Sequence, residues 1–441
     1  MSSSSRSGRR VVITGLGLIS PLGNRPEALW DALSARRSGV GPLTSLPPGS
    51  LPVSFAAEAR EFSGRIEDFG ELEGEQKKQI RKGLKVMCRE CLMGVAASQL
   101  ALADSKLKPD QRHPERAGII FGSDYMVSGP EEFVAPIEAC LDEQRQFHFS
   151  RWSPDGLSKM NPLWLLKYLP NMPASHVAIY NDLRGPNNSL THREASGNLA
   201  IGEAFRIIVR DHADVMLAGA TGTRVHPMKA LHARLLEELS AERTPERASR
   251  PFDRDRSGMV LGEGAGAIVL EELEHAQTRG ATIFAEVVGA ASSAVVDRSL
   301  TARPDVALAN AMRAALREAD CSPDNVGHIH AHGLGARQSD IDEARALAEV
   351  FGPRAAQVPV TAAKSYFGNL GAASGVVELI ASTLAFGRGA LFPVLNYETP
   401  DPECPVAAVT ADGVDPGESF LNLSTTPQGQ ASCVLVRRFA G

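Results

Sequence analysis

The sequence predicts an α/β protein in which helices cover largely parallel β-sheets. Short apolar runs rich in β-branched residues, typical of buried strands, alternate with longer segments of helical periodicity. This alternation occurs twice along the 441 residues. The composition, with 43% hydrophobic and 22% charged residues, is that of a large globular protein. No apolar run approaches the ~20 residues of a membrane helix, so we expect no membrane span.

Charge and cysteine content narrow the possible partners and cofactors. The net charge of −6 gives no reason to expect a nucleic-acid partner. Residues 1–9 are small and basic without an apolar core, which predicts a disordered tail rather than a signal peptide. The six cysteines fit a reducing compartment, so we expect a cytoplasmic protein. Cys88 and Cys91 form a C-x-x-C motif within the helical pattern 86–103. With no second pair at zinc-site spacing, we interpret them as a buried helix face, and we expect no metal and no cofactor.

The first strand, 11–15, is the β-branched run V-V-I-T-G, and it leads into G-L-I-S-P-L-G. These glycines do not complete G-x-G-x-x-G, so a dinucleotide site is not predicted. A helix at 26–38 follows, with proline in its first turn. The remaining elements expected in this half are helices at 75–85, 86–103 and 273–279, and strands at 116–122, 213–221, 267–271 and 283–289.

The second half repeats the rhythm of strands and helices. Its expected helices are 304–320, 340–351 and 371–388, and its expected strands are 326–332, 358–361 and a terminal pair within 420–437. The segment 129–160 is polar and aromatic without a clear period, and we expect an irregular insertion there.

Residues 184–202, R-G-P-N-N-S-L-T-H-R-E-A-S-G-N-L-A-I-G, are the centre of the pattern. A Gly-Pro turn leads to Glu194-Ala195-Ser196-Gly197, and a helix of small residues then continues to about Val209. Such an elbow places one side chain at a helix N-terminus, where free N–H groups and the dipole favour an anion. The alternative is a purely structural turn.

Several segments together resemble the β-ketoacyl-acyl carrier protein synthases, or ketosynthases, which have the thiolase fold. They are the elbow, the opening V-I-T-G-L-G with S-P-L-G, R-P-F-D-R-D-R-S-G-M-V-L-G-E-G-A-G-A at 250–267, and L-F-P-V-L-N-Y-E-T-P at 391–400. The resemblance implies two similar βαβαβ halves, 10–272 and 273–441, that form a five-layered α-β-α-β-α core.

The resemblance also assigns site residues. Ketosynthases carry a cysteine nucleophile at the elbow, where this chain has Glu194. His332 in I-H-A-H-G matches the first catalytic histidine, whereas His330 is expected to pack in the core. Asn369 stands where the second histidine is expected. Glu343 matches the family's buried acid, and Lys364 matches its lysine partner.

Two further segments depart from the family. Leu334 and Ala336 replace the threonines that hold pantetheine, and Pro427 interrupts the glycine-rich gate loop. Together with Glu194 and Asn369, these changes predict that the chain does not catalyse the condensation reaction of the family. An ionised Glu194 would repel a malonyl carboxylate. The simpler alternative is that Glu194 only caps the helix.

Three functions fit this pattern. The first is a non-condensing homologue, comparable to the chain-length factors that pair with an active ketosynthase. The second is a malonyl-acyl carrier protein decarboxylase, which the charge of Glu194 and Asn369 both disfavour. The third is a different chemistry that uses Glu194 and His332 as acid and base.

The resemblance names partners as well. Lys78, Arg81 and Lys82 lie near one another on the helix 75–85 and match the surface that binds acyl carrier protein, although a solvated face explains them equally well. Tyr125 stands beside the family's acyl tunnel, where it narrows the tunnel or fills core. The strand 213–221 is expected at the two-fold axis of a homodimer, or of a heterodimer with an active ketosynthase.

Overall fold

The computed structural model describes residues 8–47, 49 and 53–440. Within them, eleven strands form one sheet in the order β11-β10-β9-β12-β13-β8-β1-β7-β6-β4-β5, and β2 and β3 form a separate pair. The strands are β1 Val11–Ile19, β2 Gly41–Pro42, β3 Phe55–Ala56, β4 Ala117–Ser123, β5 Asn187–Leu190, β6 Val215–Thr223, β7 Glu263–Glu272, β8 Ala285–Ala294, β9 His328–His330, β10 Pro359–Thr361, β11 Ala407–Ala408, β12 Ser419–Thr425 and β13 Gln430–Arg437.

The helices fall mainly where the sequence predicts them. They are α1 Pro26–Ser34, α2 Gly74–Gly83, α3 Arg89–Ser105, α4 Val134–Ala139, α5 Met172–Asn181, α6 Ser196–Val209, α7 Pro227–Leu236, α8 Leu273–Thr278, α9 Pro304–Glu318, α10 Arg337–Phe351, α11 Lys364–Phe367 and α12 Ser374–Arg388. The predicted helix 371–388 begins with a 3₁₀ turn, Gly371–Ala373, before α12.

The large sheet contains the same arrangement twice. In chain order, the first set is β1, β4, β5, β6 and β7, and it pairs as β5-β4-β6-β7-β1. The second set is β8, β9, β10, β12 and β13, and it pairs as β10-β9-β12-β13-β8, which is the same order of first to fifth strand. The two sets meet where Val11–Ile13 of β1 pair with β8.

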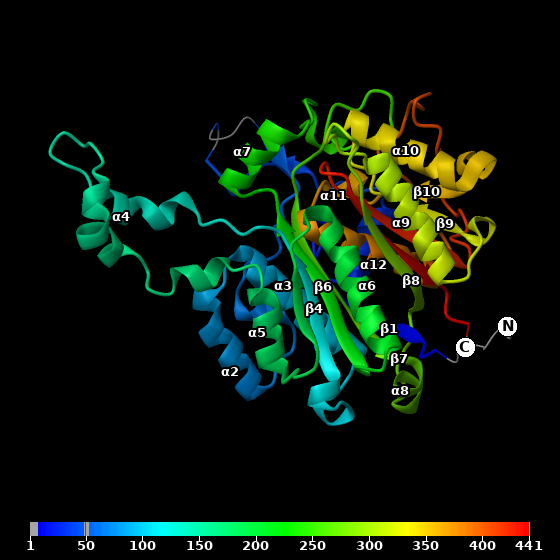
Figure 1. Ribbon diagram of the computed structural model, residues 1–441, viewed down its shortest axis with the longest axis horizontal. Helices are drawn as coiled ribbons and strands as arrows, with labels where there is room; N and C mark the ends of the chain where they lie inside the picture. Colours follow the sequence, from blue (N-terminus) through cyan, green and yellow to red (C-terminus); the bar gives the residue numbers. More distant parts are fainter. Residues whose placement is uncertain (1–7, 48, 50–52, 441) are drawn as a thin grey trace.

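Helices divide these two sets into layers (Figure 1). α6 contacts β4 and β6 of the first set and β8 and β13 of the second, while α12 contacts β7 and β12, so both helices lie between the sets. α3 and α5 cover the outer face of the first set, and α9 and α10 cover the second. The order is therefore α-β-α-β-α, the thiolase-like core that the sequence predicts.

The prediction of largely parallel sheets was wrong. Five of the ten strand pairings in the large sheet are antiparallel, among them β12 with β13 and both neighbours of β7. The alternation of strands and helices does not reveal strand direction where a tight turn replaces the helix. β12 and β13 are joined by such a turn, which only antiparallel strands accept.

The glycines of V-I-T-G-L-G allow a close approach between β1 and α3. A Cβ at Gly17 would lie 2.1 Å from the carbonyl oxygen of Ala97, and one at Gly15 would lie 2.4 Å from that of Ala101. No side chain fits at these distances, so the motif serves packing rather than nucleotide binding.

The insertion 129–160 contains α4 and several short 3₁₀ or π turns, and it projects from the body of the protein (Figure 1). Apolar side chains are exposed along it and just beyond it: Val134, Ile137, Phe147, Phe149, Leu157, Leu163, Leu165 and Leu166. An exposed group of this extent is typical of a surface that a partner covers.

Two expectations about the ends and the dimer axis need correction. Residues 1–7 of the predicted tail lie outside the described residues, but Arg9 is held by Asp211 at 2.8 Å and by Asp214, so the tail does not extend to residue 9. β6 lies inside the sheet with β4 and β7 paired along its two edges, so its backbone cannot meet a second copy.

In the part of the chain that the structure describes, no helix has the length and apolarity to cross a membrane.

Candidate functional site

The elbow residue Glu194 lies in a short 3₁₀ turn, Arg193–Ala195, between β5 and α6. Arg193 has a φ of 50°, a left-handed conformation that is rare for a residue with a long side chain. The hydroxyl of Ser196 accepts a 2.7 Å hydrogen bond from the backbone N–H of His192 and fixes the turn. Glu194 is 1% exposed and its side chain is enclosed by protein.

The Glu194 carboxylate binds three side chains. Its Oε1 accepts hydrogen bonds from the Arg224 guanidinium and, at 3.0 Å, from Nδ2 of Asn369. Its Oε2 lies 3.4 Å from Nε of Arg193. Burial alone raises the pKa of Glu194, but the attraction of Arg224 and then of Arg193 exceeds this effect and holds the pKa far below its ordinary value. Glu194 is therefore a permanent, paired anion.

This geometry corrects the helix-cap interpretation of Glu194. The N-cap residue of α6 is Ala195, whose methyl group accepts no hydrogen bond, and the Glu194 side chain turns to Arg224 instead. A guanidinium within hydrogen-bond distance outweighs the weaker attraction of the helix N-terminus.

Two more carboxylates complete the network around Glu194. Nη1 of Arg224 lies 3.3 Å from Oδ2 of Asp124, and Arg193 donates to Glu237. Arg224 is 2% exposed and Asp124 is fully buried. We call the five residues Asp124, Arg193, Glu194, Arg224 and Glu237 the elbow ion cluster. Sequence reasoning missed Arg224 and Glu237 and treated the segment containing Asp124 only in terms of its bulk.

The sheet explains why these residues meet. β4, β5 and β6 are parallel neighbours, so their carboxyl ends lie together at one edge. Asp124 directly follows β4, Glu194 follows β5 after a short turn, and Arg224 directly follows β6. Side chains from this edge of an α/β sheet commonly form binding and catalytic sites.

Tyr125 lies next to Asp124 but outside the elbow ion cluster. Its hydroxyl forms a 2.8 Å hydrogen bond with Nδ1 of His232, and its ring centroid lies 5.1 Å from Nζ of Lys229. Lys229 is itself buried and paired with Glu90. These contacts hold Tyr125 in one position at the side of the site.

His332 comes from the corresponding edge of the second set, after β9. Its Nδ1 lies 3.3 Å from Nζ of Lys364, which also donates to the His332 carbonyl oxygen at 2.8 Å. Burial and then the Lys364 charge hold the pKa of His332 well below its ordinary value, so the imidazole is neutral. His330 packs in the core, as expected, with Nδ1 2.8 Å from the hydroxyl of Ser382.

The expected pair of Glu343 with Lys364 was wrong. The carboxylate partner of Lys364 is Glu378 on α12, which the sequence analysis did not select. Glu343 instead accepts hydrogen bonds from the backbone N–H groups of His332 at 2.7 Å and Gly333 at 2.8 Å. Its physical role is thus to fix the loop that follows β9, and burial raises its pKa to about 7.

A cavity of about 490 Å³ leads to Glu194 and His332. Leu334, Ala336 and Pro427 line it, so both of the sequence departures noted above lie along this cavity. Four carboxylates also line it: Glu194, Glu237, Glu238 and Asp342. Among the described lining residues there is no lysine or arginine. The charged groups of this largely apolar cavity are therefore all acidic.

The gate segment is a tight β-hairpin. Thr426 donates to Gln430 at 2.8 Å, and Gly429 donates to Thr426 at 3.1 Å, with Pro427 in the turn. Asn369 is also fixed, because its Oδ1 accepts a 2.9 Å hydrogen bond from the backbone N–H of Gly371. Both segments are thus held by local hydrogen bonds.

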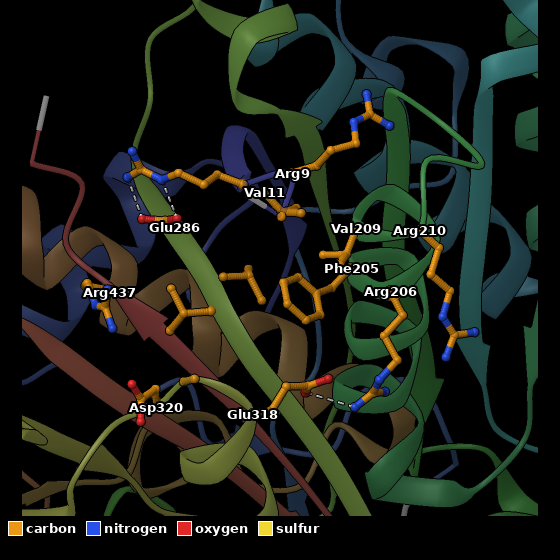
Figure 2. A pocket seen from close by; sticks show the side chains of 15 residues that line it. Arg9, Val11, Phe205, Arg206, Val209, Arg210, Glu286, Glu318, Asp320 and Arg437 are labelled. Atoms are coloured by element: carbon orange, nitrogen blue, oxygen red, sulfur yellow. Dashed lines mark hydrogen bonds and ion pairs between the residues drawn. The ribbon is translucent and has the colours of Figure 1, made fainter. Parts of the chain in front are cut away.

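A larger cavity, of about 930 Å³, lies elsewhere and contains none of the predicted site residues. Figure 2 shows it between α6 and β8, with arginines around an apolar floor that includes Val11 and Phe205. Arg10 is paired with Glu286 at 2.8 Å and Arg206 with Glu318 at 3.0 Å, so much of its positive charge is already neutralised.

Lys78, Arg81 and Lys82 are exposed together on α2, and Lys78 pairs loosely with Glu75 at 3.7 Å. They lie outside the lining of the cavity at Glu194. Within the described ranges, no group of three His, Cys, Asp or Glu side chains is placed to hold a metal ion.

Comparisons with known proteins identify the family. The N-terminal domain of β-ketoacyl synthases matches residues 8–276, and the C-terminal domain matches residues 284–398. The chain belongs to the β-ketoacyl synthase family. It is 36% identical over 401 residues to 3-oxoacyl-[acyl-carrier-protein] synthase 2 of Coxiella burnetii, covering 90% of each protein. It is 31% identical over 429 residues to the enzyme of the same name from Staphylococcus aureus strain COL, covering 97% of this chain and 98% of that one.

Solved structures of β-ketoacyl synthases are also similar. The ishigamide ketosynthase/chain length factor superposes with a TM-score of 0.82 at 28% identity, covering 98% of this chain and all of that one. A β-ketoacyl synthase from Burkholderia phymatum gives 0.81 at 29% identity with the same coverage. The AntDE:AntF complex, a type II PKS acyl-carrier protein with its ketosynthase, gives 0.80 at 26% identity.

The buried Glu343 predicts a pH dependence of stability. The pKa of Glu343 is raised from 4.5 to about 7 in the folded protein, so the folded state retains a proton that the unfolded state has lost. The free energy of unfolding should therefore fall as pH rises from about 4.5 to about 7. In Glu343→Gln, the free energy of unfolding, measured with urea at a series of pH values, should depend less steeply on pH, by the equivalent of about one proton per chain. Glu349→Gln, an exposed change on the same helix, should keep the wild-type slope, and an unchanged slope in Glu343→Gln would refute the assignment.

Proposed function

We propose that this chain is a non-condensing subunit of fatty acid or polyketide biosynthesis, with a role similar to that of a chain-length factor. The observation that carries this proposal is the state of Glu194, which occupies the nucleophile position as a buried anion bound by Arg224, Arg193 and Asn369. Condensation by this family needs a group at that position that forms a thioester.

Glu194 is unsuited to carry an acyl group for two reasons. A carboxylate is a weak nucleophile towards a thioester, and this one has a strongly lowered pKa. It would also have to leave Arg224, and breaking a buried ion pair typically costs about 3–5 kcal/mol. The elbow ion cluster thus holds the Glu194 carboxylate in place, where the family performs its chemistry.

The cavity supports the same proposal. Leu334 and Ala336 offer no hydroxyl to a pantetheine amide, and four carboxylates line the space. Malonyl and phosphopantetheine groups are anionic. The elbow ion cluster has three carboxylates and two guanidinium groups, so its net negative charge disfavours such groups in this cavity.

The two enzymatic alternatives are disfavoured by the same groups. A malonyl decarboxylase would have to bind a carboxylate beside Glu194. An acid–base pair of Glu194 and His332 would need a pKa near the working pH, whereas the pKa of each lies well below its ordinary value.

The proposed partner is a second ketosynthase-fold chain with an intact nucleophile, and the fold offers a surface for it. β5 is the last strand of the sheet, and among the described strands only β4 pairs with it. Beside this edge, Leu190 of β5 and Leu199 and Ile207 of α6 line a surface cavity of about 380 Å³, together with the polar residues His192, Glu203, Arg206 and Arg210. A free strand edge is a common site of pairing between chains, and the three apolar side chains add to the surface that a partner would cover.

Acyl carrier protein remains the second proposed partner. Lys78, Arg81 and Lys82 form a basic, exposed face on α2 that suits an acidic protein, and the AntDE:AntF complex contains an acyl-carrier protein bound to its ketosynthase. In the same scheme Tyr125, held by His232 and Lys229, narrows the acyl tunnel of the assembled pair.

The proposal predicts no condensation by the chain alone. After incubation with acyl-acyl carrier protein and malonyl-acyl carrier protein, mass spectrometry should find no β-ketoacyl product and no acyl mass on the protein. Glu194→Cys should also fail to turn over, because Asn369, the acidic lining and the Pro427 hairpin remain. A β-ketoacyl product from the wild type would refute the proposal, and sustained turnover by Glu194→Cys would show that the other changes matter little.

The proposal also predicts where the partner binds. Co-expression with an active ketosynthase from the same organism should give a one-to-one heterodimer in size-exclusion chromatography with light scattering. Ile207→Asp, which places a charge on the α6 face, should dissociate it. The control Leu300→Asp changes a residue that is 82% exposed in a distant turn and should leave the complex intact. A complex that survives Ile207→Asp would place the interface elsewhere, and a stable monomer under all conditions would remove the partner role.

A further inference from the structure

Three sulfur atoms meet at the start of α3. Cys88 is the N-cap residue of α3, not part of its interior as predicted, and Cys91 lies in the first turn. Met126 reaches them from the segment after β4. The Cys88 Sγ to Cys91 Sγ distance is 3.6 Å, and each Sγ lies 3.7 Å from Sδ of Met126.

These distances describe a nearly equilateral triangle. A point equidistant from the three sulfurs lies about 2.1 Å from each of them. Metal–thiolate bonds are ~2.3 Å long in zinc sites, so a widening of a few tenths of an ångström would admit a metal ion at the centre. The sulfur atoms of two cysteines at the start of α3 and of Met126 after β4 thus already lie close to the arrangement that a metal ion needs.

We propose that Cys88, Cys91 and Met126 bind one Cu(I) ion in a three-coordinate, all-sulfur site. Thiolate and thioether groups are soft ligands that select Cu(I). A structural zinc site needs four ligands, and the described residues place no third His, Cys, Asp or Glu beside the two cysteines. On binding, the two thiols release their protons to solvent and the metal keeps its oxidation state.

The surroundings suit such a site. Cys88 and Met126 are partly exposed and provide an entrance, whereas Cys91 is buried and forms the floor. Near the floor, the Cys91 thiol also approaches the carbonyl oxygen of Lys167 at 3.7 Å.

Helix capping alone does not account for Cys88. N-cap positions favour Ser, Thr, Asp or Asn, whose oxygens accept from the first-turn N–H groups. Here the Cys88 thiol lies against the sulfurs of Cys91 and Met126 instead. The variant Cys88→Ser should therefore fold well, since serine is a good N-cap residue. A loss of metal binding in this variant can then be attributed to the missing thiol.

The test is Cu(I) binding by the full-length, reduced protein under anaerobic conditions, in competition with the chromophoric chelator bicinchoninate. The wild type should hold one Cu(I) per chain, and X-ray absorption should show three sulfur neighbours at ~2.3 Å. Cys88→Ser should lose the site, and Met126→Leu, which keeps the volume, should raise the Kd at least tenfold. Cys321→Ser and Met172→Leu are matched controls and should bind as the wild type does.

Two results would overturn the proposal. One is Cu(I) retention that Cys88→Ser and Met126→Leu leave unchanged, which would place the metal elsewhere. The other is a wild-type protein that loses all Cu(I) to the chelator, including the case in which thiol titration shows that Cys88 and Cys91 have joined in a disulfide. Circular dichroism of each variant separates loss of the site from loss of the fold.

Discussion

The buried ion pair between Glu194 and Arg224 is the constraint on which the rest of the site depends. Both side chains are almost fully enclosed, so each needs the opposite charge of the other. The other charged groups are arranged around this pair. Asp124 lies beside the second terminal nitrogen of Arg224, and Arg193 contacts both Glu194 and Glu237. The parallel strands β4, β5 and β6 bring these groups to one edge, at the elbow that follows β5.

The proposed function combines two features of this chain: the fold of its family and the ion cluster at its elbow. The two five-strand sets, the enclosed helices α6 and α12 and the cavity are those of a β-ketoacyl synthase. In the proposed function, charged, apolar and tightly hydrogen-bonded residues stand at the positions that the resemblance assigns to acyl binding and activation. A chain of that kind serves beside an active ketosynthase, because pairing uses the sheet edge and helix faces rather than the elbow.

The sequence predicted much of this structure, for physical reasons that also explain its failures. Strong local patterns predicted the helices and strands, and the elbow motif predicted that Glu194 is presented by a turn. Arg224 was missed because a lone arginine after a strand has no local signal, and only the sheet order brings it to Glu194. The resemblance paired Lys364 with Glu343, but a sequence does not show which helix faces which loop, and the partner is Glu378. The resemblance also placed the strand 213–221 at the dimer axis, and its small apolar residues fit a sheet interior as well as they fit an interface.

A double-mutant cycle at the elbow tests the central claim most directly. Glu194→Gln, Arg224→Met and the double variant should be compared by urea unfolding at neutral pH. Each single change removes the main partner of a buried charge, because Glu194 then keeps only Arg193 and Arg224 keeps only Asp124 as an oppositely charged neighbour. The account therefore predicts that the double variant loses less stability than the two single variants together, with a coupling energy of at least ~2 kcal/mol. A coupling energy below ~0.5 kcal/mol would contradict it, since Glu194 would then be free of Arg224 and available for chemistry.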